Sequence, residues 1–249
     1  MTLKGKVAIV TGSSRGIGSA TAELLAQHGA RVTVNYAKNR EAGEATLARI
    51  EAGGGTGILV QADVTDLKQV KALVERTERE LGPIDILVNN ANMSFPVTPF
   101  VDFPWEGFER KLLHEMKAAF YCCQAVVKGM MQRKQGCIVN VSSGLSRVPG
   151  QGFIAHTSAK SALDAFSKAL ALELGPFGIR VNVVAPGLTI TDATAHQPQA
   201  MKTAAAERTP LKRLAQPEDI AGAVLFYCTD GSRFVTGTYM PVCGGTQMT

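Results

Sequence analysis

Short runs of apolar, largely β-branched residues alternate along the chain with longer segments whose apolar positions recur every three or four residues. The first pattern is typical of buried strands and the second of helices that pack on one side. Together they predict strand 6–11, helix 16–28, strand 31–36, helix 40–52, strand 56–61, helix 66–81, strand 84–88, helix 105–133, strand 137–142, helix 157–175 and strand 179–184. Because unbroken apolar strands are expected where helices cover both faces of a parallel sheet, the predicted fold class is α/β, a doubly wound parallel sheet flanked by helices on both faces.

The pattern loosens after Pro186. A loop with short helices is predicted over 187–215, followed by a helix over 217–229 and a strand over 238–242. Long loose segments inside compact domains often close over a substrate, so we interpret 187–215 as a substrate lid, with an ordinary surface loop as the alternative. The chain of 249 residues shows no internal repeat or linker, which favours a single domain over residues 1–249.

The composition is that of an ordinary globular protein, with 45% hydrophobic and 19% charged residues. Lys plus Arg exceeds Asp plus Glu by 26 to 21, which gives a net charge of +5 spread along the chain. Its densest cluster, Lys128, Arg133 and Lys134, suits a solvated helix face better than a nucleic-acid site. The chain contains no run of 18 consecutive apolar residues, which a membrane-spanning helix would need. The apolar run at 7–10 is too short for a secretion signal.

The cysteines and histidines argue against disulfides and metals. The five cysteines are odd in number and lack a Cys-x-x-Cys pair, which indicates reduced thiols and a cytoplasmic protein. The histidines have neither the i, i+4 pairing nor the Cys/His spacing of a zinc site, so no metal is expected. These residues are Cys122, Cys123, Cys137, Cys228, Cys243, His28, His114, His156 and His196.

A glycine-rich loop directly follows the first predicted strand. Residues 11–18 read Thr-Gly-Ser-Ser-Arg-Gly-Ile-Gly, and the first helix opens inside this segment. Glycine permits a tight turn and lets backbone N–H groups approach a pyrophosphate, which the positive end of a helix then stabilises. A glycine loop alone also fits a plain turn with positive φ, but the strand–turn–helix context favours a dinucleotide site.

The end of the second predicted strand bears on which dinucleotide binds. Folds that bind NAD usually carry Asp or Glu there to hold the ribose hydroxyls, and this chain has Asn35 instead. Lys38, Arg40 and, in the glycine loop, Arg15 are suited to a 2′-phosphate through charge-assisted hydrogen bonds. The alternative is that Lys38 and Arg40 only solvate a helix start, where acidic residues would be the better choice. The pattern favours NADP over NAD.

From the glycine loop onward the chain resembles the short-chain dehydrogenase/reductase family over nearly its whole length. Five motifs agree in order and spacing: the loop at 11–18, Asp63-Val64, Asn89-Asn90-Ala91, Asn140-Val141-Ser142-Ser143, and Pro186-Gly187 followed by Thr191. The resemblance implies a Rossmann-like fold, a nicotinamide coenzyme, carbonyl–alcohol chemistry on a small-molecule substrate and, frequently, a homotetramer. The positions expected to bind the coenzyme are Gly12, Ser14, Arg15, Gly16, Ile17, Gly18, Asn35, Lys38, Asp63, Val64, Asn90, Lys160, Pro186, Gly187 and Thr191.

The chain departs from this family at the positions that carry the reaction. The family uses Asn, Ser, Tyr and Lys, with the Tyr as proton donor four residues before the Lys. Ser143 and Lys160 match, but His156 stands in the place of the Tyr and Glu115 in that of the Asn. Asn92 also replaces the usual Gly after Ala91, a milder change because Asn tolerates left-handed backbone.

A histidine changes the chemistry that is expected at this position. Imidazole is shorter than phenol, so the substrate must lie deeper or a water must bridge the gap. A nearby Lys160 cation should lower the pKa of His156 and favour neutral imidazole, whereas Glu115 would act in the opposite direction or form an ion pair with Lys160. His156 is then a surrogate acid/base in a redox reaction, a base or orienting group in a non-redox reaction, or a polar remnant. Retention of the coenzyme motifs and of Lys160 favours the first role.

The predicted helix over 157–175 carries apolar residues around much of its circumference. Such a helix must be covered on more than its sheet side. By resemblance, the cover is a partner subunit, which predicts a homo-oligomer, either a tetramer or a dimer. Complete burial within one subunit is the alternative.

These observations predict an NADP(H)-dependent oxidoreductase that acts on a carbonyl, alcohol or related unsaturated group of a small organic or acyl substrate. Its catalytic residues are expected to be Ser143, His156 and Lys160, with Glu115 as a further candidate. Two rival functions remain open at this point: a non-redox isomerase, dehydratase or cyclase on the same scaffold, and a coenzyme-binding protein without catalysis.

Overall fold

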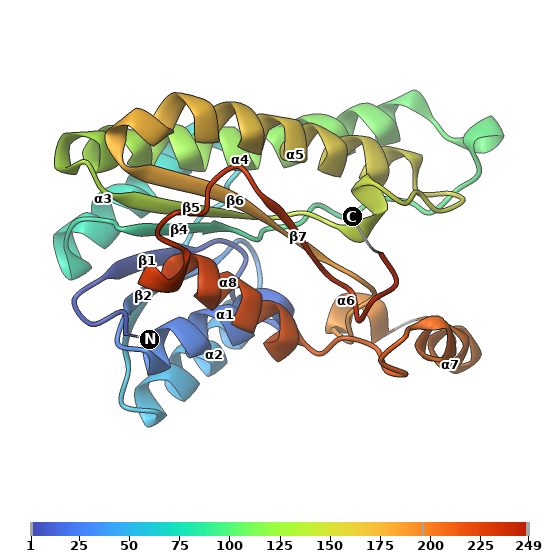
Figure 1. Ribbon diagram of the computed structural model, residues 1–249, viewed down its shortest axis with the longest axis horizontal. Coiled ribbons are helices and arrows are strands. Elements are labelled where there is room, and N and C mark those ends of the chain that lie inside the picture. Colours follow the sequence, from blue (N-terminus) through green and yellow to red (C-terminus); the bar gives the residue numbers. More distant parts are fainter. Residues whose placement is uncertain (1, 196, 248–249) are drawn as a thin grey trace.

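The computed structural model describes residues 2–195 and 197–247. Within this part of the chain, one sheet of parallel strands runs in the order β3-β2-β1-β4-β5-β6-β7 (Figure 1). The strands are β1 (Val7–Val10), β2 (Arg31–Tyr36), β3 (Thr56–Gln61), β4 (Ile86–Asn89), β5 (Gly136–Val141), β6 (Ile179–Pro186) and β7 (Tyr239–Val242). Because β1 pairs with both β2 and β4, the strand order reverses here, and the carboxyl ends of β1 and β4 border the crevice where such sheets bind ligands.

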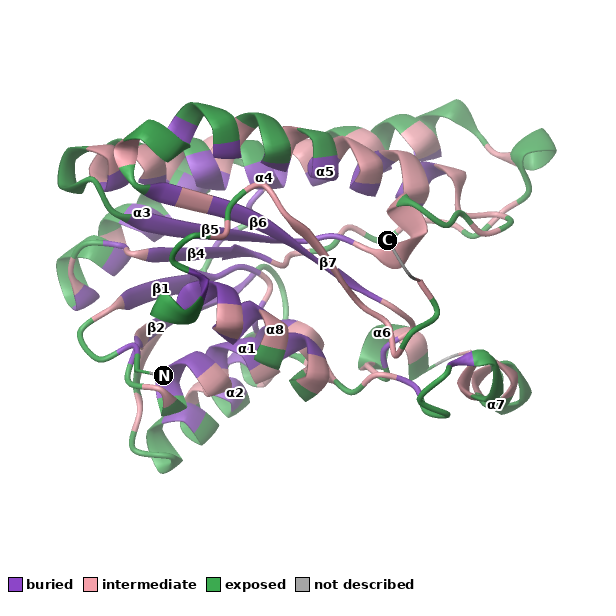
Figure 2. Ribbon diagram, viewed as in Figure 1, coloured by how far each residue is buried: buried purple, intermediate pink, exposed green. Residues whose placement is uncertain are grey.

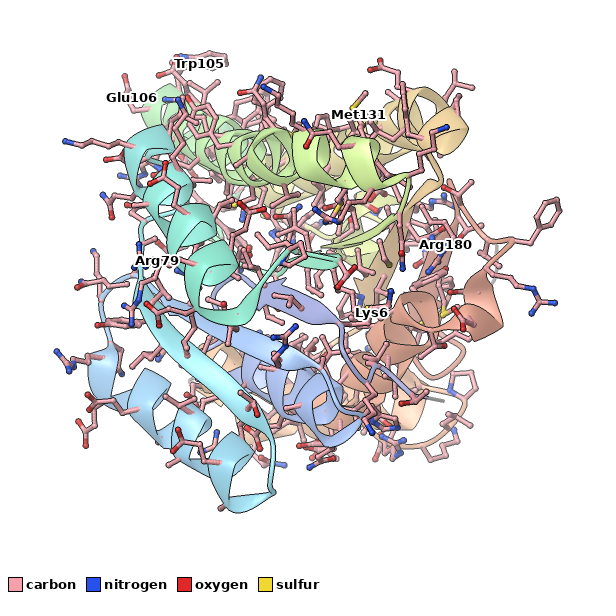
Figure 3. All side chains as sticks on the ribbon, turned by 90° about the vertical axis from the view of Figure 1, so that its left-hand side faces the viewer. Lys6, Arg79, Trp105, Glu106, Met131 and Arg180 are labelled. Atoms are coloured by element: carbon pink, nitrogen blue, oxygen red, sulfur yellow. The ribbon has the colours of Figure 1, made fainter. Side chains whose placement is uncertain are left out.

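Helices cover both faces of the sheet (Figures 1 and 3). The helices of one face are α1 (Gly16–Gln27), α2 (Arg40–Ala52) and α8 (Pro217–Cys228), and those of the other are α3 (Leu67–Leu81), α4 (Trp105–Arg133) and α5 (Ile154–Leu174). Figure 3 shows the sheet between these two layers from the amino ends of its strands, near Lys6 and Arg180. A separate apolar core fills each face, and the central strands between the cores are buried, whereas the edge strands β3 and β7 are only partly buried (Figure 2). The predicted fold class, a single α/β domain with a doubly wound parallel sheet, is confirmed.

Most predicted boundaries agree with the structure to within two residues, and helix 105–133 coincides with α4. The exception is α5, which begins at Ile154 instead of 157, directly after a turn in which Gly152 has φ +79°. His156 therefore lies in the first helical turn. Since residues four apart share a helix face, His156 is on the same side of α5 as Lys160.

The segment at 187–215 contains two short helices, α6 (Asp192–Ala195) and α7 (Gln199–Arg208), as predicted, and neither has a buried residue. Short 3₁₀ helices complete the described fold: η1 (Phe100–Asp102), η2 (Gly144–Ser146), η3 (Gly175–Phe177) and η4 (Asp230–Ser232). None of the helices in the described ranges is both long and apolar enough to span a bilayer.

Candidate active site

The glycine loop between β1 and α1 is shaped for close approach of a ligand. Gly12 and Gly16 have φ +60° and +57°, a region that L side chains rarely adopt. A Cβ atom at Gly18 would collide with the side-chain amide of Asn90 and the carbonyl oxygen of Gly12. Helix α1 begins after Arg15 with no side-chain cap from the described residues and no acidic residue in its first turn. Its first N–H groups are thus left for an anion, which fits the pyrophosphate of a dinucleotide.

Asn35 holds this loop in place. Its Oδ1 accepts a hydrogen bond from Gly12 N at 3.0 Å, and its Nδ2 donates to the carbonyl oxygens of Val60 and Ala62 at 3.4 and 3.1 Å. The side chain is 1% exposed, and both of its amide atoms are engaged. This differs from the expected place on the ribose, because the glycine loop and the end of β3 take up the amide. Asn35 can act on a dinucleotide only through the loop that it fixes.

Other predicted coenzyme residues lie at the same edge of the sheet, because they follow the carboxyl ends of parallel strands. They are Lys38 after β2, Asp63 and Val64 after β3, Asn90 after β4, and Pro186 and Gly187 at the end of β6. Asn90 Nδ2 donates to the carbonyl oxygens of Thr11 and Gly12 at 2.9 and 3.1 Å, so it too fixes the loop. Thr191 approaches from the lid segment, since a Cβ at Gly16 would lie 3.4 Å from its methyl group. Within the loop, Ser14 and Ile17 are half-buried.

The cations expected to receive a 2′-phosphate lie on the surface. Arg40 Nε already donates to Glu44 Oε1 at 2.7 Å, and Arg15 lies 3.9 Å from Asp192. Lys38 is exposed and has no ion-pair partner within residues 2–195 and 197–247. It is therefore the most available of the three cations for a phosphate.

Packing of α4 against α5 brings three charged side chains together inside the protein. Glu115 Oε1 accepts from Lys160 Nζ at 2.5 Å, and Glu115 Oε2 accepts from Lys111 Nζ at 2.6 Å. Their exposures are 3%, 3% and 1% for Glu115, Lys160 and Lys111. The ion pair between Glu115 and Lys160, one of the two alternatives that the sequence left open, is present. Two ammonium groups against one carboxylate leave a net charge of +1 in this cluster, which we call the buried triad.

The triad sets the protonation of its own members. Burial alone would raise the pKa of Glu115, but the ammonium groups of Lys160 and Lys111 outweigh it and lower that pKa to about 2. Burial lowers the pKa of Lys111 to about 8, and Glu115 only partly offsets this effect. Glu115 is therefore ionised at neutral pH, while Lys111 titrates near the upper end of the physiological range.

His156 lies beside the triad in an apolar setting. Its ring stacks on Phe95 with the centroids 4.5 Å apart and an angle of 22° between the planes. Its Nδ1 is buried and has no hydrogen-bond partner among the described residues. Burial, followed by the charges of Lys160 and Lys111, lowers the pKa of His156 to about 3 against the opposing effect of Glu115. The imidazole is therefore neutral at physiological pH, as expected from the sequence, although burial contributes more than the lysine.

Ser143 and Lys160 each keep a donor free for a ligand. Ser143 Oγ accepts a hydrogen bond from Leu145 N at 3.2 Å, which leaves its own O–H available. Lys160 donates two of its three N–H bonds within the protein, to Glu115 and to the carbonyl oxygen of Val141 at 2.8 Å. The third has no acceptor among the described residues. Both residues lie near the carboxyl end of β5, at the edge of the sheet that also carries the glycine loop.

The sequence did not single out Lys111 or Phe95. A signal for Lys111 was present, since Lys111 and Glu115 are four residues apart on a predicted helix and such pairs face each other. Phe95 lies in the irregular segment between β4 and α4, where periodicity gives no guidance. No cluster of metal ligands occurs in the described ranges, and His196 lies outside them.

The lid segment encloses a cavity of about 400 Å³ together with the C-terminal segment after β7. Gly187 and Cys243 line it, and their backbones approach each other so closely that a Cβ at Gly187 would be 3.0 Å from Cys243 Cα. Arg208 and Arg213 also line it. Part of the segment predicted as a lid therefore borders a cavity that Gly187 also lines.

Comparison with known proteins agrees with this geometry. The family model described as enoyl-(acyl carrier protein) reductase matches residues 12–247. A 3-oxoacyl-[acyl-carrier-protein] reductase of Synechocystis sp. is 37% identical over 247 residues, covering 99% of this chain and 98% of that protein. An uncharacterized oxidoreductase of Methylorubrum extorquens is 39% identical over 98% of this chain and 99% of its own. The solved structure of LugOII, a promiscuous reductase that catalyses keto-reduction at C1 during lugdunomycin biosynthesis, superposes with a TM-score of 0.93 at 36% identity, covering 100% of both chains. The chain belongs to the short-chain dehydrogenase/reductase family, and its homologues are oxidoreductases.

Proposed function

We propose that the protein is an NADP(H)-dependent oxidoreductase that acts on a carbonyl, alcohol or related unsaturated group of a small organic or acyl substrate. The observation that carries this proposal is the placement of His156 and Lys160 on one buried face of α5, at the edge of the sheet that also holds the glycine loop. The reductases among the relatives, which act on 3-oxoacyl and keto groups, support the choice of a carbonyl.

Each residue has a separate task in this proposal. A nicotinamide coenzyme, when bound, supplies the hydride that the carbonyl carbon receives. The Ser143 hydroxyl donates a hydrogen bond to the carbonyl oxygen and stabilises the negative charge that develops there. Lys160 directs its remaining N–H toward the ribose, while its hydrogen bonds to Glu115 and Val141 hold the ammonium in place.

His156 transfers the proton in place of the usual phenol. A neutral imidazole has one N–H to donate and one lone pair. The cations that disfavour the imidazolium ion also stabilise the deprotonated ring, so the net charge of the buried triad favours donation of the N–H proton to the alkoxide oxygen. Solvent then restores the proton to the ring. In the reverse direction, solvent first removes the N–H proton, and the same nitrogen then receives the proton of the alcohol.

The remaining parts of the proposal concern residues at or near the protein surface. Lys38 would bind the 2′-phosphate of NADP, and residues 187–215 would close over the substrate. The exposed Phe120 on α4 and Leu172 on α5, at 45% and 80%, support a homo-oligomer, a dimer or tetramer in which a partner subunit covers this layer. Free cysteines in the described ranges support a reducing, cytoplasmic location.

Coenzyme binding is the first test, measured by NADPH and NADH fluorescence. Gly18→Ala should weaken binding at least about tenfold, because the added methyl collides with Asn90 and the loop backbone. The matched control is Gly222→Ala, where a Cβ meets open space on α8, and it should leave the affinity unchanged. Equal affinities for wild type and Gly18→Ala would contradict the coenzyme site.

Turnover is the second test, followed by NADPH absorbance with a panel of ketones and acyl substrates. Activity of the wild type that disappears in His156→Ala supports the proposal. Substrate conversion seen by mass spectrometry without coenzyme oxidation would instead show a non-redox enzyme. Activity that arises only in His156→Tyr would show a coenzyme-binding protein that has lost catalysis.

A further inference from the structure

Lys111 is a buried charge that touches neither substrate nor coenzyme in the reaction steps above and enters them only through the net charge of the buried triad. Its ammonium donates to Asn92 Oδ1, Met93 O and Glu115 Oε2 at 2.7, 2.9 and 2.6 Å. All three N–H bonds are thus used inside the protein, and the residue is 1% exposed. A buried ammonium loses its hydration, and mutual repulsion with Lys160 adds to the cost. An apolar side chain would fill this position without either cost, which indicates that the charge itself has a role.

The contacts of Lys111 lead to His156 along two routes. Lys111 Nζ lies 5.0 Å from the centroid of Phe95, whose ring stacks on His156, and a cation over an aromatic ring is attractive. The same ammonium fixes the backbone just before Phe95 through Met93. Lys111 therefore holds the surface against which the imidazole lies. It also places a positive charge behind that surface.

We propose that Lys111 is a positioning residue for His156, which holds the imidazole plane through the loop at 92–95 and whose charge favours donation of the ring N–H. The kinetic consequence rests on the proposed redox function. The effect on the protonation of His156 belongs to the protein without substrate and can be measured without turnover.

The charges around His156 come from two helices. Lys111 and Glu115 face it from α4, and Lys160 faces it from α5. Asp164 lies one turn beyond Lys160 and hydrogen-bonds Ser146 at 2.7 Å. The loop at 92–95 carries no ionisable side chain. Because the pKa of Lys111 is about 8, its charge and its support of His156 decline as the pH rises through that value.

The direct test is a titration of the histidine Cε1–H signals by NMR, with His156→Gln to assign the resonance. In the wild type, His156 should stay neutral down to about pH 4. Lys111→Met should raise the midpoint by about one pH unit, because a repelling cation is removed. Asn92→Ala removes one hydrogen bond of the loop but keeps the ammonium, so its midpoint should match the wild type. An unchanged midpoint in Lys111→Met would overturn the proposal.

The kinetic test compares pH profiles of kcat and KM. Wild-type kcat should fall as the pH rises through about 8, whereas Lys111→Arg, which stays charged, should retain activity to higher pH. Lys111→Met should lower kcat about tenfold at pH 7 with KM within about threefold. A rise in KM alone, with an unchanged profile in both variants, would assign Lys111 a merely structural role. If Lys111→Met does not fold, the pH profile of kcat for Lys111→Arg tests the proposal. A profile identical to that of the wild type would then overturn it. If no substrate is turned over, the proposed function fails while the NMR titration still tests Lys111.

Discussion

The two sides of the crevice are built in opposite ways. Beside β1 and β2, the groups offered to a ligand are backbone N–H groups, which the neutral amides of Asn35 and Asn90 hold in position, and the cations lie on the surface. Beside α4 and α5, the charges themselves are buried and bonded to one another, with Glu115 between Lys111 and Lys160. A surface charge can change without disturbing the fold. A buried charge that loses its partner cannot, because the remaining ion is left without solvation.

Removal of the central carboxylate is the largest test of this contrast. Glu115→Leu leaves two ammonium groups facing each other in the interior, and we expect it to reduce the free energy of unfolding by about 3–5 kcal/mol. Urea denaturation measures the loss. The double variant Glu115→Leu, Lys111→Met removes the repulsion between the ammonium groups and should recover part of it. If Glu115→Leu lowers the free energy of unfolding by less than about 1 kcal/mol, the triad is solvated. The charges beside α4 and α5 would then be no more costly to change than those on the surface beside β1 and β2.

On the coenzyme side, the corresponding test is Asn35→Asp. The carboxylate can still accept from Gly12 N, but it faces the carbonyl oxygens of Val60 and Ala62 with no N–H to donate. We expect a loss of about 2–3 kcal/mol in the free energy of unfolding and no gain in NADH affinity. Asn39→Asp is the matched control, because this N-cap is exposed and Asp caps helices as well as Asn. Tighter NADH binding by Asn35→Asp would contradict this expectation. It would indicate that residue 35 contacts the ribose, as the sequence predicts for the end of the second strand.

The same contrast explains what the sequence could predict. Strand and helix periods were sufficient to predict the parallel sheet, and the glycine loop was sufficient to predict a tight turn between β1 and α1, because both depend on backbone geometry. The expected neutrality of His156 and the alternative of an ion pair between Glu115 and Lys160 came from the family resemblance, which placed these residues in one site. The hydrogen bond of Asn35 to the glycine loop could not be predicted, since a single residue at a strand end carries no periodicity. Phe95 was missed because irregular backbone positions it, and only tertiary packing brings it to His156.

Acid should weaken the fold mainly through His156 and the buried triad between α4 and α5. The pKa of His156 is about 3 in the folded protein against its ordinary 6.5, so the unfolded chain binds a proton first. The stabilisation by neutral His156 is therefore complete above about pH 6.5 and is lost as the pH falls toward 3. Glu115, at about 2 against its ordinary 4.5, adds a further loss below about pH 4.5.

Between pH 6 and 4.5 we expect His156 to account for a decline of about 1 kcal/mol per pH unit, measured by urea denaturation at a series of pH values. His156→Gln should flatten the curve in that window while leaving the loss below pH 4.5, which belongs to Glu115. Identical curves for wild type and His156→Gln above pH 4.5 would mean that the imidazole titrates normally and that burial does not control it.

The smallest effect on the fold should come from the surface cation Lys38. Lys38→Glu is expected to weaken NADPH binding about tenfold, to leave NADH within about threefold, and to change the free energy of unfolding by less than about 0.5 kcal/mol. Arg40→Ala should do less to NADPH, since this guanidinium is already paired with Glu44. Equal losses of affinity for NADH and NADPH would mean that Lys38 does not bind the 2′-phosphate. If the preference between NADPH and NADH changes while the free energy of unfolding does not, exposed charges set the coenzyme preference. The protonation of His156, in contrast, depends on buried charges that cannot be removed without destabilising the fold.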